Sequence, residues 1–382
     1  MSYHAVGLHP AQLPESARRI QTEVREFIAA ELGDDPASRG GAGWNPRSPE
    51  FSRKVGARGW IGMTWPRAFG GHGRTMLERF IVTEEMLAAG APVGAHWIAD
   101  RQSGPLLIRY GTDLQRARFL PGIVAGELYF SIGMSEPDAG SDLAAVRTSA
   151  RKVDGGWLLN GRKTWTSGAH LSHFMITLCR TATTEDRHQG LSQLIVDLAA
   201  PGLEITPVRY MTGEHHWNDV VFDDVFVPDD MLVGEAGAGW RQVTSELTLE
   251  RSGPERFLSA YQVLVALVDE VGPSPDDHAA AALGDLYAQL WTLRRMAMAV
   301  AFALDGGGNP AVEAALVKDL GTRFEGQLVE TARAIVLPGD REPGGRFERL
   351  LEHALLSKPS FTLRGGTSEI LRSVVAKGLV SG

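Results

Sequence analysis

The spacing of apolar positions changes twice along the chain, near residue 127 and again near residue 234. Before the first change, apolar residues recur every three or four positions, as in the run from Pro14 to Gly33, which is typical of amphipathic helices. Between the two changes, apolar and polar residues alternate, and turn signals such as Asp154-Gly155 and Asn160-Gly161 separate the runs. After the second change, long helical runs with short connections indicate an antiparallel bundle.

This order predicts an N-terminal all-α domain over residues 1–126, a middle antiparallel β domain over 127–233 and a C-terminal α-helical bundle over 234–382. Met296 and Met298, with Trp291 and Phe302, fit the apolar core of the bundle better than contact with a cofactor. Helices are expected over residues 14–33, 75–89, 100–110, 113–125, 240–271, 276–304, 310–337, 346–356 and 368–375, and strands over 129–134, 156–159, 173–179, 191–198 and 219–227.

Composition narrows the class of protein. With 382 residues and 43% hydrophobic content, the chain is long enough for two or three domains with a substantial core. The net charge of -8 and the scattered basic residues argue against nucleic acid as a partner. Cys179 is the only cysteine, which excludes an intrachain disulfide and a multi-thiolate metal site. Since there is no run of about 18 apolar residues and no secretory signal pattern, we expect a soluble cytoplasmic protein without a membrane segment.

Two groups of histidines could suggest a metal site: Glu214-His215-His216, and His170 with His173. Adjacent residues of a β-segment point to opposite faces, so His215 and His216 cannot easily share one ion. We therefore expect no bound metal.

Two segments of the β domain carry the most specific chemistry. The first, Tyr129 to Ser141, is a short apolar strand followed by a cluster of turn residues that exposes backbone N–H groups and small hydroxyls. The second, Asn160 to Gly168, ends in Trp-Thr-Ser-Gly. Together they offer donors for an electron-poor heteroaromatic ring and a flat indole to lie against it. A surface hairpin with one packed Trp would contain the same residues and is the alternative interpretation.

This pair of segments resembles the acyl-CoA dehydrogenase family, in which the matching loop and strand hold the isoalloxazine ring of FAD. The order of a helical, a β and a second helical domain is also that of the family. The resemblance implies that the backbone of Met134 and the hydroxyl of Ser135 bond the pyrimidine side of the flavin. It also implies that Ser141 lies near the flavin phosphates and the thioester end of the substrate.

Further flavin contacts follow from the same resemblance. Trp165 would cover the ring, and Thr166 with Ser167 would meet the region of flavin N5. Thr367 and Glu369, near the C-terminus, match family positions that touch FAD.

The catalytic base is expected at Glu250. Many family members place a glutamate just before the Gly-Thr of a C-terminal loop, but that position here is Gly365, which cannot remove a proton. Other members carry the base on the first helix of the C-terminal bundle, immediately before an arginine, and here Glu250-Arg251 matches. Because Pro254 cannot donate to the Glu250 carbonyl, a bend is expected there. An exposed helix glutamate in an ion pair is the alternative.

Two more substrate contacts follow from the resemblance. The Gly365 N–H would bond the thioester oxygen, on which enolate charge develops, and Arg251 would bind or orient part of the CoA chain.

The chain departs from the family where FAD diphosphate is bound. In the homotetrameric members, a neighbouring subunit holds the diphosphate and adenine through Arg-x-x-Phe-Gly and Gln-x-x-Gly-Gly segments. Residues 269–278 and 334–340 lack the arginine, the glutamine and the paired glycines. In some actinobacterial relatives that act on steroid side-chain thioesters, two unlike subunits form an α2β2 tetramer and divide these residues. The resemblance therefore implies an oligomer in which a second, related chain completes the flavin site.

The expected function is FAD-dependent α,β-dehydrogenation of an acyl-CoA thioester to the trans-2-enoyl-CoA, with electrons passing to an electron-transfer flavoprotein or a similar acceptor. A non-catalytic subunit that completes a partner's site is one alternative. A flavin oxidase or hydroxylase of related fold is another. The helix-borne base and the steroid-pathway likeness favour a bulky or branched acyl group, whose identity the sequence does not give.

Overall fold

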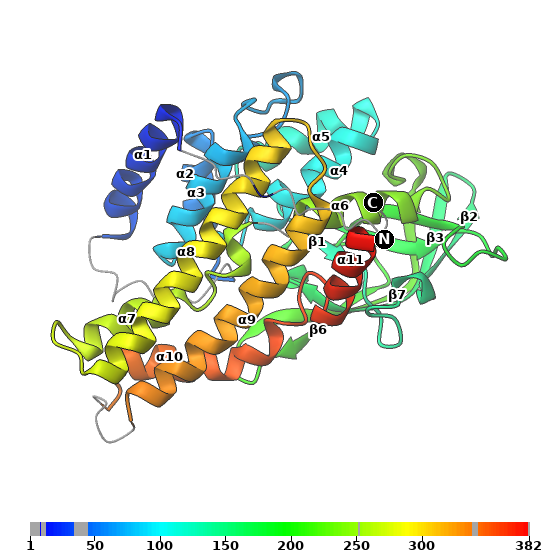
Figure 1. Ribbon diagram of the computed structural model, residues 1–382. Coiled ribbons are helices and arrows are strands. Elements are labelled where there is room, and N and C mark those ends of the chain that lie inside the picture. The colour runs from blue at the N-terminus through cyan, green and yellow to red at the C-terminus, as the bar shows by residue number, and fades with distance from the viewer. Residues whose placement is uncertain (1–7, 9–12, 34–44, 251–252, 338–342, 381–382) are drawn as a thin grey trace. The chain divides into compact units, whose positions relative to one another are not determined.

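The computed structural model describes residues 8, 13–33, 45–250, 253–337 and 343–380, with the backbone alone for 246–250. The chain forms two compact units, each built from separate stretches of sequence (Figure 1). Unit 1 comprises Met1–Pro46, Arg74–Val93 and Glu250–Gly382, and unit 2 comprises Arg47–Gly73 and Gly94–Leu249. The domain boundaries expected at residues 126 and 233 stay predictions.

Unit 1 contains a bundle of helices in which α8 and α9 lie side by side (Figure 1). Its helices are α1 (Glu15–Leu32), α3 (Met76–Ala88), α7 (Tyr261–Val271), α8 (Asp277–Asp305), α9 (Ala311–Ile335), α10 (Arg346–Ser357) and α11 (Ser368–Val380).

Local sequence fixes the start of α3 and its attachment to α8. Thr75 and Glu78 form a capping box, in which each side chain accepts the other residue's backbone N–H at 3.0 Å. The Asp305 carboxylate, at the end of α8, accepts the N–H groups of Met76 (2.6 Å) and Leu77 (3.2 Å). A negative charge at a helix N-terminus is favourable, so this contact stabilises the start of α3.

Unit 2 is built around one sheet of seven strands within the described residues. The strand order is β1-β4-β2-β3-β7-β6, and β5 pairs with β4. The strands are β1 (Phe130–Gly133), β2 (Ser149–Val153), β3 (Gly156–Ser167), β4 (Phe174–Arg180), β5 (Leu191–Asp197), β6 (Leu203–Arg209) and β7 (His215–Pro228), and the helices of the unit include α2 (Pro49–Ala57), α4 (Gly104–Tyr110), α5 (Asp113–Val124) and α6 (Gly239–Glu250).

Two details of the sheet differ from expectation. β1 and β4 pair in parallel, whereas β3 pairs antiparallel with both β2 and β7. The tight turn between β2 and β3 falls at Asp154-Gly155, where Gly155 has φ +72°, and Asn160-Gly161 lies inside β3. Gly161 is needed there for close approach, because a Cβ at this position would lie 2.6 Å from the Thr148 hydroxyl.

The helix expected over residues 240–271 is broken in the structure. α6 ends at Glu250, the short 3-10 helix η7 (Pro254–Arg256) follows, and α7 begins at Tyr261. This break agrees with the constraint that Pro254 imposes on the residues before it.

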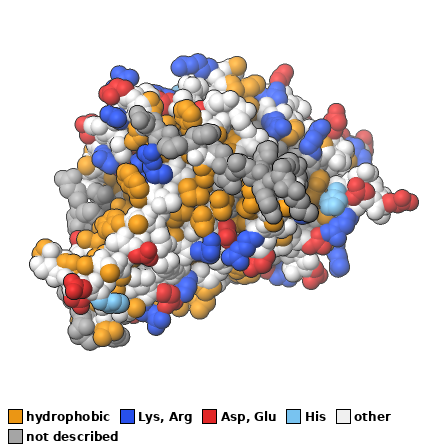
Figure 2. All heavy atoms as spheres, in the orientation of Figure 1, with side chains coloured by type: hydrophobic (Ala, Val, Ile, Leu, Met, Phe, Trp, Pro, Cys, Tyr) orange, Lys and Arg blue, Asp and Glu red, His pale blue; other side chains and the backbone are white. Residues whose placement is uncertain are grey.

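The expectation for two aromatic residues of α8 was wrong. Trp291 and Phe302 are 62% and 57% exposed and lie outside the apolar core of unit 1. On the face drawn in Figure 2, Lys and Arg side chains are interspersed with Asp and Glu side chains. None of the described helices is both long and apolar enough to span a bilayer.

Candidate active site

A buried ion pair supports the loop that follows β1. The Lys163 ammonium is fully buried in β3 and donates to the Glu136 carboxylate (2.8 Å) and to the Met134 carbonyl (2.9 Å). Glu136 also accepts the backbone N–H groups of Arg147 (2.7 Å) and Thr148 (2.9 Å). The loop is therefore fixed to the sheet at its first residues.

Opposing effects act on the pKa of each partner in this pair. Burial raises the pKa of Glu136, but the charge of Lys163 and the hydrogen bonds outweigh it, so the net pKa is lowered. Burial lowers the pKa of Lys163, and Glu136 opposes that shift. Glu136 is thus held as a carboxylate whose role is to support the loop.

The groups expected to bind the flavin pyrimidine have unused hydrogen-bonding capacity. Met134 and Ser135 are half-buried, and neither the Met134 N–H nor the Ser135 hydroxyl bonds another residue that the structure describes. The Ser135 carbonyl, by contrast, accepts the Thr164 N–H at 2.9 Å, which joins the loop to β3. Ser141 is exposed on the same loop.

Trp165 protrudes from the end of β3. The pairing of β3 with β7 shifts register between Lys163 and Thr166, and within this bulge Trp165 has φ +57° and is 56% exposed. A bulky residue in the left-handed region is strained, and such strain gathers at functional sites. The Trp165 ring meets the Trp217 ring edge to face, with 5.4 Å between centroids. The bulge thus leaves the indole exposed, as the expected contact with the flavin ring requires, and that contact stays a prediction.

The residues after Trp165 differ in exposure. Thr166 is fully buried, and its hydroxyl has no hydrogen-bond partner within the described part of the chain, whereas Ser167 is half-buried. Ser167 is therefore better placed than the Thr166 side chain for the expected contact near flavin N5, which stays a prediction for both.

Asn218 holds this strained segment from β7. It is fully buried, its amide donates to the Thr166 carbonyl (2.9 Å), and its amide oxygen lies 2.7 Å from His215 Nε2. The His215 ring stacks on His170 with 3.7 Å between centroids. Burial, then the neighbouring His215 and Arg47, lower the pKa of His170 to about 4, so His170 is neutral at physiological pH. The described residues contain no group of three or more His, Cys, Asp or Glu that could hold a metal ion.

α6, which carries the expected base, packs against the loop that follows β1, residues 134–141, which we call the flavin loop. Val243 belongs to a buried cluster with Ala139 of that loop, and Trp240 and Met134 pack against the cluster. Glu250 is the last residue of α6, seven residues beyond Val243, or about 10 Å along the helix axis at ~1.5 Å per residue. The side chain of Glu250 and the whole of Arg251 lie outside the described residues.

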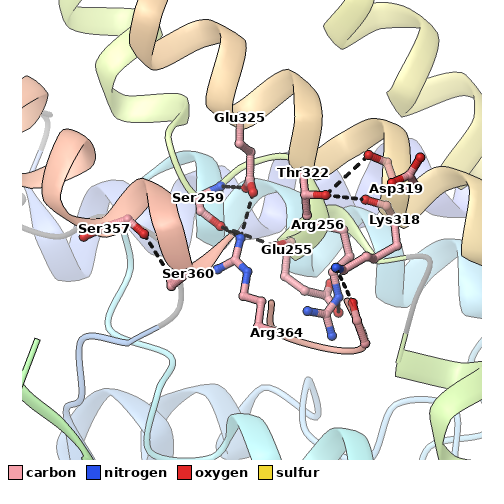
Figure 3. A network of polar contacts seen from close by, with 11 residues as sticks. Glu255, Arg256, Ser259, Lys318, Asp319, Thr322, Glu325, Ser357, Ser360 and Arg364 are labelled. Carbon is pink, nitrogen blue, oxygen red and sulfur yellow. Dashed lines mark hydrogen bonds and ion pairs between the residues drawn. The ribbon is translucent and has the colours of Figure 1, made fainter. Parts of the chain in front are cut away.

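In unit 1, residues 364–367 form a turn that we call the glycine loop (Figure 3). Gly365 and Gly366 have φ +66° and +94°, and a Cβ on Gly365 would lie 2.8 Å from the nearest guanidinium nitrogen of Arg256. The Lys318 ammonium, on α9, donates to the Gly366 carbonyl at 2.6 Å. Arg364 is fixed by the Glu325 carboxylate at 2.8 Å. The loop therefore lies against two cations, Arg256 and Lys318, and a side chain at position 365 would require a positive φ and a shift of the Arg256 guanidinium.

Thr367 and Glu369 have local roles at the start of α11. The Thr367 hydroxyl accepts the N–H of Ile370 at 3.4 Å. Hydrogen bonds from its own N–H and from Thr367 lower the pKa of Glu369. A carboxylate in the first turn stabilises a helix, so these contacts explain both residues without a ligand. Their contact with FAD stays a prediction.

Comparison with known proteins decides the family. Models of the acyl-CoA dehydrogenase N-terminal, middle and C-terminal domains match residues 14–127, 131–225 and 268–380. The acyl-CoA dehydrogenases FadE29 and IpdE1 of Mycobacterium tuberculosis are each 33% identical to the chain over 380 residues, which cover 95% of this chain and 96% and 97% of theirs. The chain belongs to the acyl-CoA dehydrogenase family.

Solved structures of acyl-CoA dehydrogenases confirm the predicted fold class. The Tcur3481-Tcur3483 steroid ACAD superposes with a TM-score of 0.86 at 27% identity, covering 96% of this chain and 97% of that one. The ChsE4-ChsE5 complex from Mycobacterium tuberculosis gives 0.84 at 28% identity, covering 98% and 99%. The FAD complex of PigA shares the fold at 20% identity, with a TM-score of 0.84.

Membership makes this acyl-CoA dehydrogenase an FAD-dependent oxidoreductase. The residues present fit the flavin ring: the Met134 N–H and the Ser135 hydroxyl have unused capacity on the flavin loop. The exposed Trp165 directly follows Thr164, whose N–H bonds the Ser135 carbonyl. The segment with Glu250 lies between the matches to the middle and C-terminal domain models.

Sequence reasoning missed the residues that support the acyl-CoA dehydrogenase site, chiefly Lys163, Asn218 and Lys318. Lys163 left a signal, because strand alternation places it on the face opposite its neighbours Arg162 and Thr164 and therefore inward. Asn218 and Lys318 left none, since their partners are distant in sequence.

Proposed function

We propose that this protein oxidises an acyl-CoA thioester to the trans-2-enoyl-CoA, with Glu250 as the base. The observation that carries the proposal is the flavin loop of unit 2, with its unused donors, beside the strained and exposed Trp165. FAD, when bound, accepts a hydride from the β-carbon of the substrate. The Glu250 carboxylate takes the proton from the α-carbon, so the two electrons of the broken C–H bond at Cα form the double bond.

The choice of Glu250 rests on two local facts. Position 365 is a glycine with positive φ beside a guanidinium, so the loop supplies no base. α6, whose last residue is Glu250, is anchored through Val243 to the buried cluster that includes Ala139 of the flavin loop. A general base works best when its pKa approaches the operating pH, and exclusion of water by an apolar acyl group would raise the pKa of a carboxylate toward it.

Two further groups complete the proposed chemistry. Enolate charge develops on the thioester oxygen. The Gly365 N–H has no partner among the described residues and can donate a hydrogen bond to this oxygen. Arg251 binds part of the CoA chain. The reduced enzyme passes its electrons to an electron-transfer flavoprotein or a similar acceptor.

Anaerobic reduction tests this function. Acyl-CoA thioesters of different chain types are added to the flavin-loaded protein and the loss of flavin absorbance near 450 nm is followed; bleaching at a rate that Glu250→Gln lowers by about 10³-fold or more is expected. Glu246→Gln, one turn earlier on α6, is the matched control and should bleach normally. Bleaching unchanged in Glu250→Gln would remove Glu250 as the base. Rapid turnover with oxygen as the preferred acceptor would instead indicate an oxidase.

We further infer that a second, related chain completes the FAD site. Residues 269–278 and 334–340 lack the arginine, glutamine and paired glycines expected for diphosphate binding. Two similar solved structures, the Tcur3481-Tcur3483 steroid ACAD and the ChsE4-ChsE5 complex, are each named for two proteins. The name "steroid ACAD" supports a bulky acyl group for this chain as well. Flavin content is measured for the protein alone and after mixing with candidate partner chains. Full occupancy of the chain alone would refute this part of the proposal.

A further inference from the structure

Lys318 is an unusual residue for the interior of a helical bundle. It is fully buried on α9, and none of the salt bridges within the described residues includes it. Its ammonium donates to the Gly366 carbonyl at 2.6 Å (Figure 3). A buried ammonium without a carboxylate partner is costly. A contact kept at such a cost suggests that the conformation of the glycine loop depends on it.

The glycine loop has hydrogen-bonding capacity to offer a ligand. The N–H groups of Gly365 and Gly366 bond no other residue in the described ranges, and both glycines are half-buried. Successive N–H groups in such turn conformations form concave sites for negative charge. With the Gly366 carbonyl fixed toward Lys318, the N–H groups of the loop remain available.

Arg256 restrains the same loop from a second side. It is 2% exposed, on η7, and its guanidinium lies where a side chain at Gly365 would begin. η7 packs closely against α9 at Gly321, where a Cβ would lie 2.5 Å from the Arg256 carbonyl oxygen. The backbone at Arg256 is therefore close-packed on α9, and its guanidinium is buried beside the loop.

We propose that Lys318 is a positioning residue for the thioester oxygen: by holding the Gly366 carbonyl, it keeps the Gly365 N–H in the orientation that receives this oxygen, and its positive charge favours the enolate. Arg256 contributes positive charge at the same loop. This inference rests on the proposed function, because it takes an acyl-CoA as the substrate.

The charge of Lys318 changes in an accessible pH range. Burial, and then Arg256 and Arg364, lower its pKa to about 7, while Glu325 and Asp319 on its own helix oppose the shift. Below this pKa the ammonium both bonds the carbonyl and carries charge; above it, the neutral amine can still donate but the charge is lost. kcat/KM should therefore fall as the pH rises above about 7. Ionisation of the base produces a separate rise in kcat/KM at lower pH.

Three variants of the flavin-loaded protein test the role. Lys318→Met should lower kcat by about 10- to 100-fold with a smaller change in KM, and should lose the decline in kcat/KM above pH 7. Lys318→Arg keeps the charge and should move that decline to higher pH. Lys358→Met is the control, since the Lys358 side chain is 35% exposed and pairs with Glu330 of α9, the helix that also carries Lys318. A decline at the same pH in all three variants would overturn the proposal.

Binding provides a test that does not depend on turnover. The thioester that reduces the wild-type flavin fastest is paired with its S-alkyl-CoA thioether, which has the same carbon skeleton but lacks the carbonyl oxygen. Lys318→Met should weaken binding of the thioester by about tenfold and of the thioether by less than about twofold. Equal weakening of both would show a merely structural role and overturn the proposal. If Lys318→Met does not fold, the pH profile of Lys318→Arg decides in the same way.

The two proposals fail differently. If no thioester reduces or binds the wild-type protein, the proposed function fails and this role falls with it. If the wild type is active and Lys318→Met binds the thioester in preference to the thioether as strongly as the wild type does, only the role of Lys318 is refuted.

Discussion

Removing the Lys163 ammonium should destabilise the protein through the flavin loop. The Glu136 side chain is only 7% exposed. In Lys163→Met its carboxylate keeps the hydrogen bonds from the N–H groups of Arg147 and Thr148 but loses its positively charged partner. Breaking a buried pair by removing one partner costs about 3–5 kcal/mol. Glu136 can also become protonated in the variant, and the free energy of protonation sets an upper limit on the loss of stability that the unpaired charge causes. From an ordinary pKa of about 4.3, that limit is roughly 3.7 kcal/mol at pH 7 and roughly 1 kcal/mol at pH 5.

This limit gives the prediction its pH dependence. The folded-state pKa of Glu136 is lowered in the wild type, so the pair contributes stability above the ordinary glutamate pKa, and this contribution is lost as the pH falls through the lowered value. Urea unfolding at pH 7 should show Lys163→Met less stable than the wild type by about 3–4 kcal/mol, and the difference should shrink by about 1.4 kcal/mol per pH unit toward pH 5.

The double variant Lys163→Met/Glu136→Gln separates charge from packing. The glutamine oxygen can still accept the loop N–H groups, and no charge is left buried, so the double variant should be more stable than Lys163→Met by about 2 kcal/mol. A loss below about 1 kcal/mol in Lys163→Met, or one independent of pH, would refute the reasoning. A double variant that is less stable than Lys163→Met would refute it as well.

Three further outcomes are expected. Gly365→Glu, introduced into Glu250→Gln, should not restore flavin bleaching by acyl-CoA, because residue 365 has positive φ and lies against a guanidinium; restored bleaching would contradict this. Asn218→Leu should weaken FAD binding by about tenfold in a flavin titration, since it removes the bond to the Thr166 carbonyl beside the strained tryptophan; unchanged affinity would count against that role. The pKa of Lys318 is about 7 in the folded protein and about 10.4 in the unfolded chain, so the unfolded chain binds more protons between these pH values. The stability of the wild type, measured by urea unfolding, should therefore rise relative to that of Lys318→Met from pH 7 to pH 10. A stability difference that does not change with pH would argue against the shifted pKa.

Much of the fold could be predicted because the signals for it are local. The ends of α1 at Pro14 and Gly33 and the turn at Asp154-Gly155 depend on residues next to one another in sequence. Asn160-Gly161 carries the same turn signal, but its glycine serves close approach to Thr148, a contact that no local pattern reveals. Trp291 was assigned to the core because helical periodicity shows which residues share a face, and it does not show whether another helix covers that face.

The candidate site divides in the same way. Trp165 and Ser135 could be named from the sequence because each stands in a continuous motif, yet the positive φ of the exposed Trp165 occurs at the bulge against β7. The ion pair of Lys163 with Glu136 joins residues 27 positions apart, and the contact of Lys318 with Gly366 joins residues 48 positions apart. Supporting residues of this kind depend on the packed structure, so only the residues expected to touch the ligand could be named beforehand.

The cations around the glycine loop give a physical reason for moving the base elsewhere. A side chain at position 365 would have its Cβ within 3 Å of the Arg256 guanidinium, and Lys318 bonds the next residue of the loop, so a carboxylate there would have cations as neighbours. Such neighbours favour the ionised form and lower the pKa of a carboxylate, which makes it a weaker general base at neutral pH. The same charges favour a developing oxyanion at the Gly365 N–H. Proton removal and stabilisation of the enolate therefore make opposite demands on local charge, and a base at the end of α6 allows the glycine loop to serve the second alone.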